Sequence, residues 1–554
     1  YDLDDVYIQV AKIKGGYEIA QYDFDLQRYA GRQLFWSRAT GAYKELSGYT
    51  PGRSSERATA NALNDPYIFL FNLYPYYGYV GWETDVIDTF SRVADPSEEV
   101  LYLLGRAHSS LSQSRFNDNF GFADSSQFYS YAESGRNLFS KDQLDFFISH
   151  ADTAHAYFKQ LHQRNPQYLT RVGGIGMKAN NEVMYKYAWL QMYQNDTVAY
   201  NEIKDVTYNY TQLDFAKRIL SACAPDAILF TYGDNDYYAT LYVQQVLNFR
   251  KDVDVLNLSL MNFVNYINFI RDHKWYKGRQ IRMTLSEQDY AGKKLQMIQI
   301  DRPEEVSHCL PAKAFLEKVK AEEGGSVTIS ERCVRVPLPK GGEAAAPLEK
   351  NYYQSGLATL DIIATNAERP IYFTSVNEIG LDNYLQQEGM VSRLAETSYY
   401  DEKKIASFLN SLDYSQLKKD KEYALHPSYP PLIVRAYANL IVISDQQNLQ
   451  DQKLQYVNRF LDLVPGSLFN VNNDYLNMIQ SVDYTTHAAL YDRLLSRLIS
   501  DASLCLHIQG VEHQDVKRIQ ETVDGAIDIA RTKNDKIIQQ LKALQKQLQT
   551  KKAI

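Results

Sequence analysis

The chain has 554 residues, a net charge of −8, 45% apolar residues and 23% charged residues. This length allows three or four domains, and the composition is that of an ordinary globular protein. The acidic balance, and the lack of a basic tract interleaved with aromatic residues, argue against nucleic acid as a partner.

Tyrosine is abundant, with 44 residues against 23 phenylalanines and 4 tryptophans. A tyrosine offers a large ring and a hydroxyl that forms hydrogen bonds, so tyrosine-rich surfaces suit the recognition of glycans and proteins. The commoner use of tyrosine is to fill a helix-repeat core with one hydrated edge. Composition alone leaves both uses open.

The four cysteines, Cys223, Cys309, Cys333 and Cys505, are widely separated. None lies in a CxxC pair or at the Cys/His spacing of a zinc ligand, so no zinc site is expected. Cys309 and Cys333 can pair in an oxidising compartment. Free, buried thiols are the state we expect.

No targeting segment is visible in the sequence. The chain opens on the polar, acidic stretch YDLDDVYIQV, and its most apolar stretch, Tyr67 to Trp82, contains Asn72 and Pro75. A membrane-spanning helix needs about 20 apolar residues. We therefore expect a soluble chain whose signal or lipid anchor lies upstream, and which meets a membrane only through that anchor or a partner.

Five regions are predicted along the chain. The Leu-Leu-Gly-x-Ala segment at 103–107 resembles the first helix of a tetratricopeptide repeat, and 452–465 resembles a second helix that ends at proline. Ile and Leu at heptad-like spacing after residue 537 predict one long terminal helix. The regions are an irregular, Tyr-rich part at 1–95, a helical, tetratricopeptide-like part at 96–222, an α/β domain at 223–395 with a linker at 337–350, a helical, repeat-like part at 396–510, and the long helix at 511–554.

The stretch from Ala227 to Leu260 has the pattern of a βαβ unit. An apolar run stops at Gly233, an amphipathic segment follows, and a second apolar run starts at Val253. Such a unit needs about 30 residues. Residues 370–375 predict a further strand. The expected fold class is α/β plus α, with a small parallel, Rossmann-like sheet flanked by tetratricopeptide-like helices.

The turn Gly233-Asp234-Asn235-Asp236 (the GDND turn) lies between the first strand and the helix, where open α/β sheets bind ligands. Asp234 and Asn235 can cap the helix, which is the commonest role for such residues. Asp234 and Asp236 can ligate a divalent cation such as calcium, and no other cofactor is expected. Free N–H groups of the helix can bind an anion, although the two acids disfavour phosphate.

Two blocks of the chain are similar to a known family. They are 226–262, DAILFTYGDNDYYATLYVQQVLNFRKDVDVLNLSLMN, and 357–394, LATLDIIATNAERPIYFTSVNEIGLDNYLQQEGMVSRL. Both resemble parts of the soluble C-terminal region, a domain of unknown function, of a Bacteroidota envelope family. Its members also carry a multi-span membrane part that resembles protein O-mannosyltransferases. The resemblance covers roughly 205–480.

The sequence departs from that family in two places. Tyr237, Tyr238 and Ala239 stand where the family has Thr, an aromatic residue and Pro, and Ala367-Glu368 replaces a Trp before the Arg-Pro. The transmembrane glycosyltransferase half is expected to be missing. The resemblance therefore implies a periplasmic or outer-membrane-associated setting, and it does not imply transferase activity.

Two functions follow as hypotheses. The first is a non-catalytic envelope protein, with a lipid anchor upstream, that binds other envelope proteins through its helical repeats in a complex for secretion or surface-protein assembly. The second is a glycan- or cation-binding module, or an enzyme linked to envelope glycosylation, that uses a cleft between the GDND turn and the strand after Arg369. In that cleft Asn366, Arg369 and Glu388 would orient a ligand held by Asp234 and Asp236.

Overall fold

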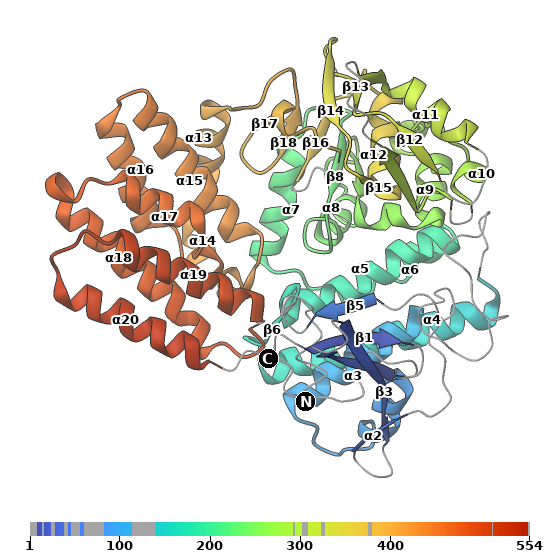
Figure 1. Cartoon of the computed structure of the whole chain (residues 1–554), viewed down its shortest axis with the longest axis horizontal. Coiled ribbons are helices and arrows are strands. Elements are labelled where there is room, and N and C mark those ends of the chain that lie inside the picture. The colour runs from blue at the N-terminus through green and yellow to red at the C-terminus, as the bar shows by residue number, and fades with distance from the viewer. Residues whose placement is uncertain are drawn as a thin grey trace.

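The computed structural model describes residues 8–13, 16–23, 28–37, 42–45, 56–59, 82–113, 139–291, 294–301, 309–322, 327–374, 379–511 and 513–551. It has three parts, which we call the N-terminal lobe (8–164), the α/β lobe (210–400) and the helical lobe (402–551). Figure 1 shows the helical lobe on the left, the α/β lobe at the upper right and the N-terminal lobe below it. The predicted combination of an α/β domain with helical regions is confirmed.

The N-terminal lobe combines an antiparallel sheet with three helices. The sheet has the strand order β4-β3-β2-β1-β5, so part of the region predicted to be irregular is regular. Successive antiparallel strands need only short turns, and aromatic and β-branched residues favour them. The aromatic residues 67–81 lie outside the described residues. The elements are β1 (Ile8–Ile13), β2 (Gly16–Asp23), β3 (Arg28–Ser37), β4 (Ala42–Glu45), β5 (Glu56–Thr59), α2 (Trp82–Phe90), α3 (Glu98–Ser112) and α4 (Lys141–Arg164).

Helices α3 and α4 pack closely at one glycine. Gly105 of α3 lies against the ring of Phe158 on α4, and any side chain at Gly105 would overlap that ring. This is the close helix approach expected from the Leu-Leu-Gly-x-Ala segment.

A central helix, α5 (Ile175–Tyr193), separates the N-terminal lobe from the α/β lobe (Figure 1). It contacts α4 on one side and the helices of the α/β lobe on the other. Nearly all its residues are buried, including polar ones. A short hairpin precedes it and two helices follow, namely β6 (Leu169–Thr170), β7 (Gly173–Gly174), α6 (Asp196–Asn201) and α7 (Tyr210–Ala222).

The main sheet of the α/β lobe is mixed, and not parallel as predicted. Its order is β19-β17-β18-β16-β8-β9, in which only the β16–β8, β8–β9 and β17–β19 pairs are parallel. The chain turns back directly after β17 into β18, and so short a return permits only an antiparallel pair. The elements are β8 (Ile228–Thr231), α8 (Tyr238–Gln245), β9 (Asp254–Asn257), β16 (Ile371–Phe373), β17 (Leu385–Gln387), β18 (Ser392–Leu394) and β19 (Tyr399–Tyr400).

Two three-stranded sheets, four α-helices and three 3-10 helices complete the described part of this lobe. Residues 337–350, predicted as a linker, instead form the turn and second strand of the β13–β14 hairpin. The elements are the 3-10 helices η4 (Ser259–Asn262), η5 (Tyr276–Gly278) and η6 (Asp382–Tyr384), the helices α9 (Val264–Asp272), α10 (Glu287–Tyr290), α11 (Ala312–Ala321) and α12 (Gln354–Thr365), and the strands β10 (Met297–Asp301), β11 (Leu310–Pro311), β12 (Thr328–Ser330), β13 (Cys333–Pro337), β14 (Glu343–Pro347) and β15 (Asn351–Tyr353).

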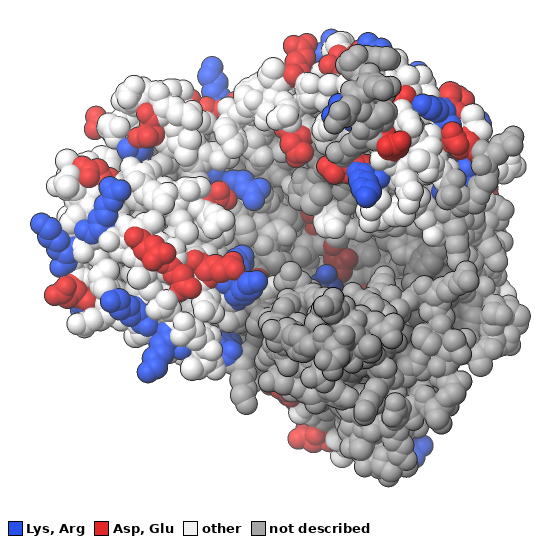
Figure 2. All heavy atoms as spheres, viewed as in Figure 1, with Lys and Arg blue, Asp and Glu red and all other residues white. Residues whose placement is uncertain are grey.

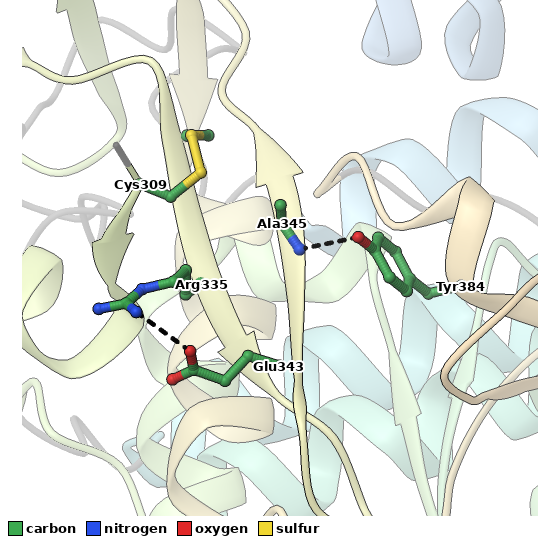
Figure 3. Close-up of a disulfide and its surroundings, with 6 residues drawn as sticks. Cys309, Arg335, Glu343, Ala345 and Tyr384 are labelled. Atoms are coloured by element: carbon green, nitrogen blue, oxygen red, sulfur yellow. Dashed lines mark hydrogen bonds and ion pairs between the residues drawn. A yellow bond between two sulfur atoms is a disulfide. The ribbon is translucent and has the colours of Figure 1, made fainter. Parts of the chain in front are cut away.

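A disulfide joins Cys309 to Cys333 at the start of β13 (Figure 3), so the expectation of free thiols is wrong for this pair. Nearby, Arg335 forms an ion pair with Glu343 across the hairpin, and the Ala345 N–H donates to the Tyr384 hydroxyl. Cys223 and Cys505 are free and buried, as expected.

Replacing both Cys309 and Cys333 with Ser is expected to lower the free energy of unfolding by about 3 kcal/mol, since a bond that closes a loop of this size restricts the unfolded chain. The two cysteines are 24 residues apart. Urea unfolding with and without dithiothreitol measures the effect. The reductant should weaken the wild type and leave the double variant unchanged; equal sensitivity of both would contradict the prediction.

The helical lobe consists of helices that pack in adjacent pairs (Figure 1), among them α15 with α16 and α19 with α20. The single long helix predicted for 511–554 is two helices, because the chain turns at Thr532 and Asn534, whose side chains donate to Asp492. No helix in the described part of the chain is both long and apolar enough to cross a bilayer. The elements are α13 (Glu402–Ser411), α14 (Tyr414–Lys419), η7 (Lys421–Leu425), α15 (Tyr429–Gln446), α16 (Gln450–Leu463), η8 (Leu468–Asn470), α17 (Asn473–Ser481), α18 (Tyr484–His507), α19 (His513–Ile529) and α20 (Asp535–Thr550).

Candidate functional site

The GDND turn follows the C-terminal end of β8, which lies between β16 and the edge strand β9 of the main sheet. Gly233 has a φ of 84°, a conformation that favours glycine. The Asn257 side chain, at the end of β9, donates to the Gly233 carbonyl over 2.8 Å. The neighbouring parallel strand therefore fixes the path of the turn.

Asp236 holds the turn to the ends of β8 and β16. Its Oδ2 accepts hydrogen bonds from the Tyr232 N–H, over 2.9 Å, and from the hydroxyl of Thr374, which follows β16. Its Oδ1 is buried and has no hydrogen-bond partner. Burial raises the pKa of Asp236 to about 7. These contacts give Asp236 a structural role, because both groups that it holds belong to the sheet or the turn.

The side chains of Asp234 and Asn235 do not cap helix α8, contrary to the commonest expectation. The residue before α8 is Tyr237, and no side chain accepts a hydrogen bond at this helix start. Asn235 instead accepts a 3.3 Å hydrogen bond from Asn181 of α5. The turn thus faces α5.

Asp234 is the residue of the turn that remains available to a ligand. Its side chain is partly exposed, and no hydrogen bond from the described residues reaches its carboxylate. Burial is the largest cause of the raised pKa of Asp234. The Glu182 carboxylate also raises this pKa, and the Lys178 ammonium group lowers it.

Helix α5 supplies three polar side chains that the sequence analysis missed, at positions 178, 181 and 182. Lys178 donates to Glu182 Oε2 over 2.6 Å, whereas Glu182 Oε1 is buried without a hydrogen-bond partner. The Tyr208 hydroxyl donates to Asn181 Oδ1 over 2.9 Å and orients its amide toward the turn. The spacing puts all three on one face of α5. The polar run from Lys178 to Glu182, in a helix otherwise rich in apolar residues, could have indicated this face from the sequence.

The arrangement does not favour a metal ion. Within the described residues, no group of three or more His, Cys, Asp or Glu side chains could hold one. Lys178, Arg106 and Arg171 act on the Asp234 carboxylate as positive charges. Together with Asp234 and Glu182 they carry three positive and two negative charges, so a divalent cation would lack ligands and meet repulsion.

The structure does not bring Asn366, Arg369 and Glu388 to the turn. Asn366 ends α12 and donates to the Arg282 carbonyl over 2.9 Å. Arg369 precedes β16 and binds Asp254 at the start of β9, over 2.6 Å, at the opposite edge of the sheet from the turn. Glu388 forms ion pairs with Arg393 and Lys404. All three side chains are engaged in structural contacts.

The fold and this turn define a class: a mixed α/β domain whose GDND turn packs on a polar face of α5, joined to a lobe of paired helices. Figure 2 shows charges of both signs interspersed over the helical lobe. Residues 212–336 match the family model described as TMEM260-associated domain 2. TMEM260 is a protein O-mannosyltransferase, so the match agrees with the resemblance to a transferase-linked soluble region. It covers the GDND turn and the disulfide, and ends before β16. Neither a curated protein nor a solved structure matches the chain.

Proposed function

We propose that the chain is a non-catalytic glycan-binding module that works outside the cytoplasm, and that its cleft at the GDND turn receives sugar hydroxyls. One observation carries this proposal. Within the described residues, no hydrogen-bond donor reaches the partly exposed Asp234 carboxylate, and the buried Glu182 Oε1 on the adjoining face of α5 has no partner either. A carboxylate that no protein donor satisfies favours a ligand that supplies donors, so such a ligand would bind favourably at Asp234.

The charge of the cleft favours a neutral ligand. Asp234 and Glu182 are negative, and Lys178, Arg106 and Arg171 are positive around them. The carboxylates would repel an anion, and the basic residues would repel a cation. A hydroxyl group is neutral and can both donate and accept, so it can satisfy Asp234 and the amide of Asn181 together.

Binding is favoured over catalysis because the cleft offers no activated nucleophile. Among the described residues, the side chains that hydrogen-bond to the GDND turn belong to Asn181, Asn257, Thr240 and Thr374. None is a cysteine or histidine, and Thr374 and Asp236, which hydrogen-bond to each other, serve to hold the turn to the sheet. Glu182 is in addition held in an ion pair with Lys178.

The location outside the cytoplasm is supported by the Cys309–Cys333 disulfide, since such bonds persist mainly in oxidising compartments. The match to a domain associated with an O-mannosyltransferase supports a link to protein glycosylation.

A second candidate function is that of an interaction subunit, and the helical lobe favours it. Its helices pack in adjacent pairs, as in repeat proteins that bind other proteins. Val442 and Leu449 are 39% and 42% exposed on this lobe, and exposed apolar side chains suit a protein partner.

The test uses methyl α-D-mannopyranoside as probe, because the matched domain is associated with a mannosyltransferase. Replacing Asp234 with Asn, or Glu182 with Gln, removes a charged acceptor and should weaken binding about 10-fold or more in isothermal titration calorimetry. The matched control is Asp226→Asn, which changes a carboxylate at the other edge of the sheet. An unchanged affinity in both cleft variants, or a wild type that binds no glycoside, would overturn the proposal. Partner capture that survives both changes would then favour the interaction subunit.

A further inference from the structure

A second site lies on the other side of α8 from the cleft. It is a pocket of about 450 Å³ between the C-terminal half of α5, the helices α6, α8 and α9, strand β9 and η5. Small-molecule sites have volumes of about 300–1,000 Å³. The pocket is therefore large enough for a ligand of one or two rings.

One wall of the pocket is aromatic and rigid. The rings of Phe269, His273 and Trp275 pack together, with His273 and Trp275 edge to face at a centroid separation of 4.8 Å. The indole N–H of Trp275 donates to the Ile270 carbonyl over 3.1 Å. These contacts hold the indole in place before any ligand arrives.

Two exposed tyrosines also line the pocket. Tyr200 of α6 is 51% exposed, and Tyr276 of η5 is 42% exposed. Lys277 has a φ of 58°, and this tight turn presents Tyr276 beside Trp275. Large exposed rings gathered around one pocket suit a ligand with an apolar face.

Polar groups of both kinds surround these rings. Asp196 is an acceptor with a 61% exposed side chain, held by Gln191 over 3.0 Å and lying 3.8 Å from His273. Asn201 and Gln245 also line the pocket, and no hydrogen bond from the described residues engages their amides. The pocket thus combines stacking surfaces with free donors and acceptors.

We propose that this aromatic pocket binds a neutral saccharide of one or two rings. The C–H face of a pyranose ring packs on an aromatic ring, while its hydroxyls pair with amides and carboxylates. A quaternary ammonium ion, the other ligand of aromatic cages, would meet Lys251, Lys274 and His273 in the same pocket. Lys251 and Lys274 would attract a phosphate that Asp196 repels, so inorganic phosphate is titrated beside the glycosides as the competing probe. The inference does not depend on the ligand proposed for the GDND cleft.

The experiment titrates the full chain with the methyl glycosides of mannose, glucose, galactose and N-acetylglucosamine, with calorimetry and tryptophan fluorescence as readouts. We expect one or more to bind and to change the tryptophan fluorescence of the chain. Tyr200→Ala should weaken that binding at least 5-fold, and Asp196→Asn at least 10-fold. Both side chains are largely exposed, so these variants should fold, which circular dichroism verifies.

Asp451→Asn is the matched control, because it alters an exposed carboxylate on α16 of the helical lobe and should leave the fluorescence titration unchanged. The inference is overturned if no glycoside binds, if Tyr200→Ala and Asp196→Asn bind as tightly as the wild type, or if tetramethylammonium binds where the glycosides do not. Loss of glycoside binding in Asp234→Asn alone would assign the sugar to the GDND cleft, and would overturn the aromatic pocket while leaving the proposed function standing.

Discussion

Replacing Asp254 with Asn is expected to lower the free energy of unfolding by about 3–5 kcal/mol, the usual cost of breaking a buried ion pair. The Asp254 side chain, at the start of β9, is 1% exposed. It accepts from Arg279 over 2.8 Å through Oδ1 and from Arg369 over 2.6 Å through Oδ2. An amide carries no charge and has only one acceptor oxygen, so at least one guanidinium would lose its partner.

Asp226→Asn provides the control for this prediction. Asp226 also pairs with Arg279, but its side chain is 67% exposed. Exposed pairs contribute at most about 1 kcal/mol. Urea unfolding at pH 7, followed by circular dichroism, measures both variants. Equal losses of unfolding free energy in the two variants would mean that the burial of Asp254 does not strengthen its ion pairs. The two arginines would then not hold the parallel strands together.

The role of Arg369 shows where sequence reasoning stopped short. Arg369 comes just before its strand, whereas the GDND turn comes just after β8. Because the two strands are parallel, these positions lie at opposite edges of the sheet. The sequence allowed this conclusion once both strands were assigned. Thr374, at the other end of the same strand, is the residue that meets the turn.

The βαβ unit could be predicted because its pattern is local. Apolar runs, a glycine and an amphipathic segment placed β8, α8 and β9 in the right order, and the structure confirms them. The direction of β17 and β18 could not be predicted in the same way. Each is three residues long, and its partners are fixed by contacts distant in sequence.

The polar residues of α5 were missed for a related reason. Periodicity shows one apolar face of a helix, but α5 is covered on several sides, so Lys178 and Glu182 are buried although charged. Only the three-dimensional arrangement reveals that the charged face meets the GDND turn. The disulfide was missed because spacing does not show whether two cysteines come within bonding distance.

Replacing Asp236 with Asn is expected to change the pH dependence of stability by about 4 kcal/mol between pH 4 and pH 8. Burial raises the pKa of this carboxyl from its ordinary value of 3.8 to about 7 in the folded protein. As the pH rises through this window, the unfolded chain releases the proton and the folded protein retains it. The stability of the wild type therefore falls with rising pH because of this group, and the variant lacks that loss.

The fold should tolerate the Asp236→Asn change, because an amide oxygen can still accept from the Tyr232 N–H and the Thr374 hydroxyl. Urea unfolding at several pH values compares the variant with the wild type and with Asp451→Asn, which alters an exposed carboxylate on α16. As the pH rises, the free energy of unfolding of the Asp236 variant should increase relative to that of the wild type. The control variant should show no such increase. If the variant instead lost stability relative to the wild type as the pH rises, Asp236 would be ionised in the folded protein. A neutral Asp236 leaves Asp234 as the acidic group of the GDND turn that a ligand meets.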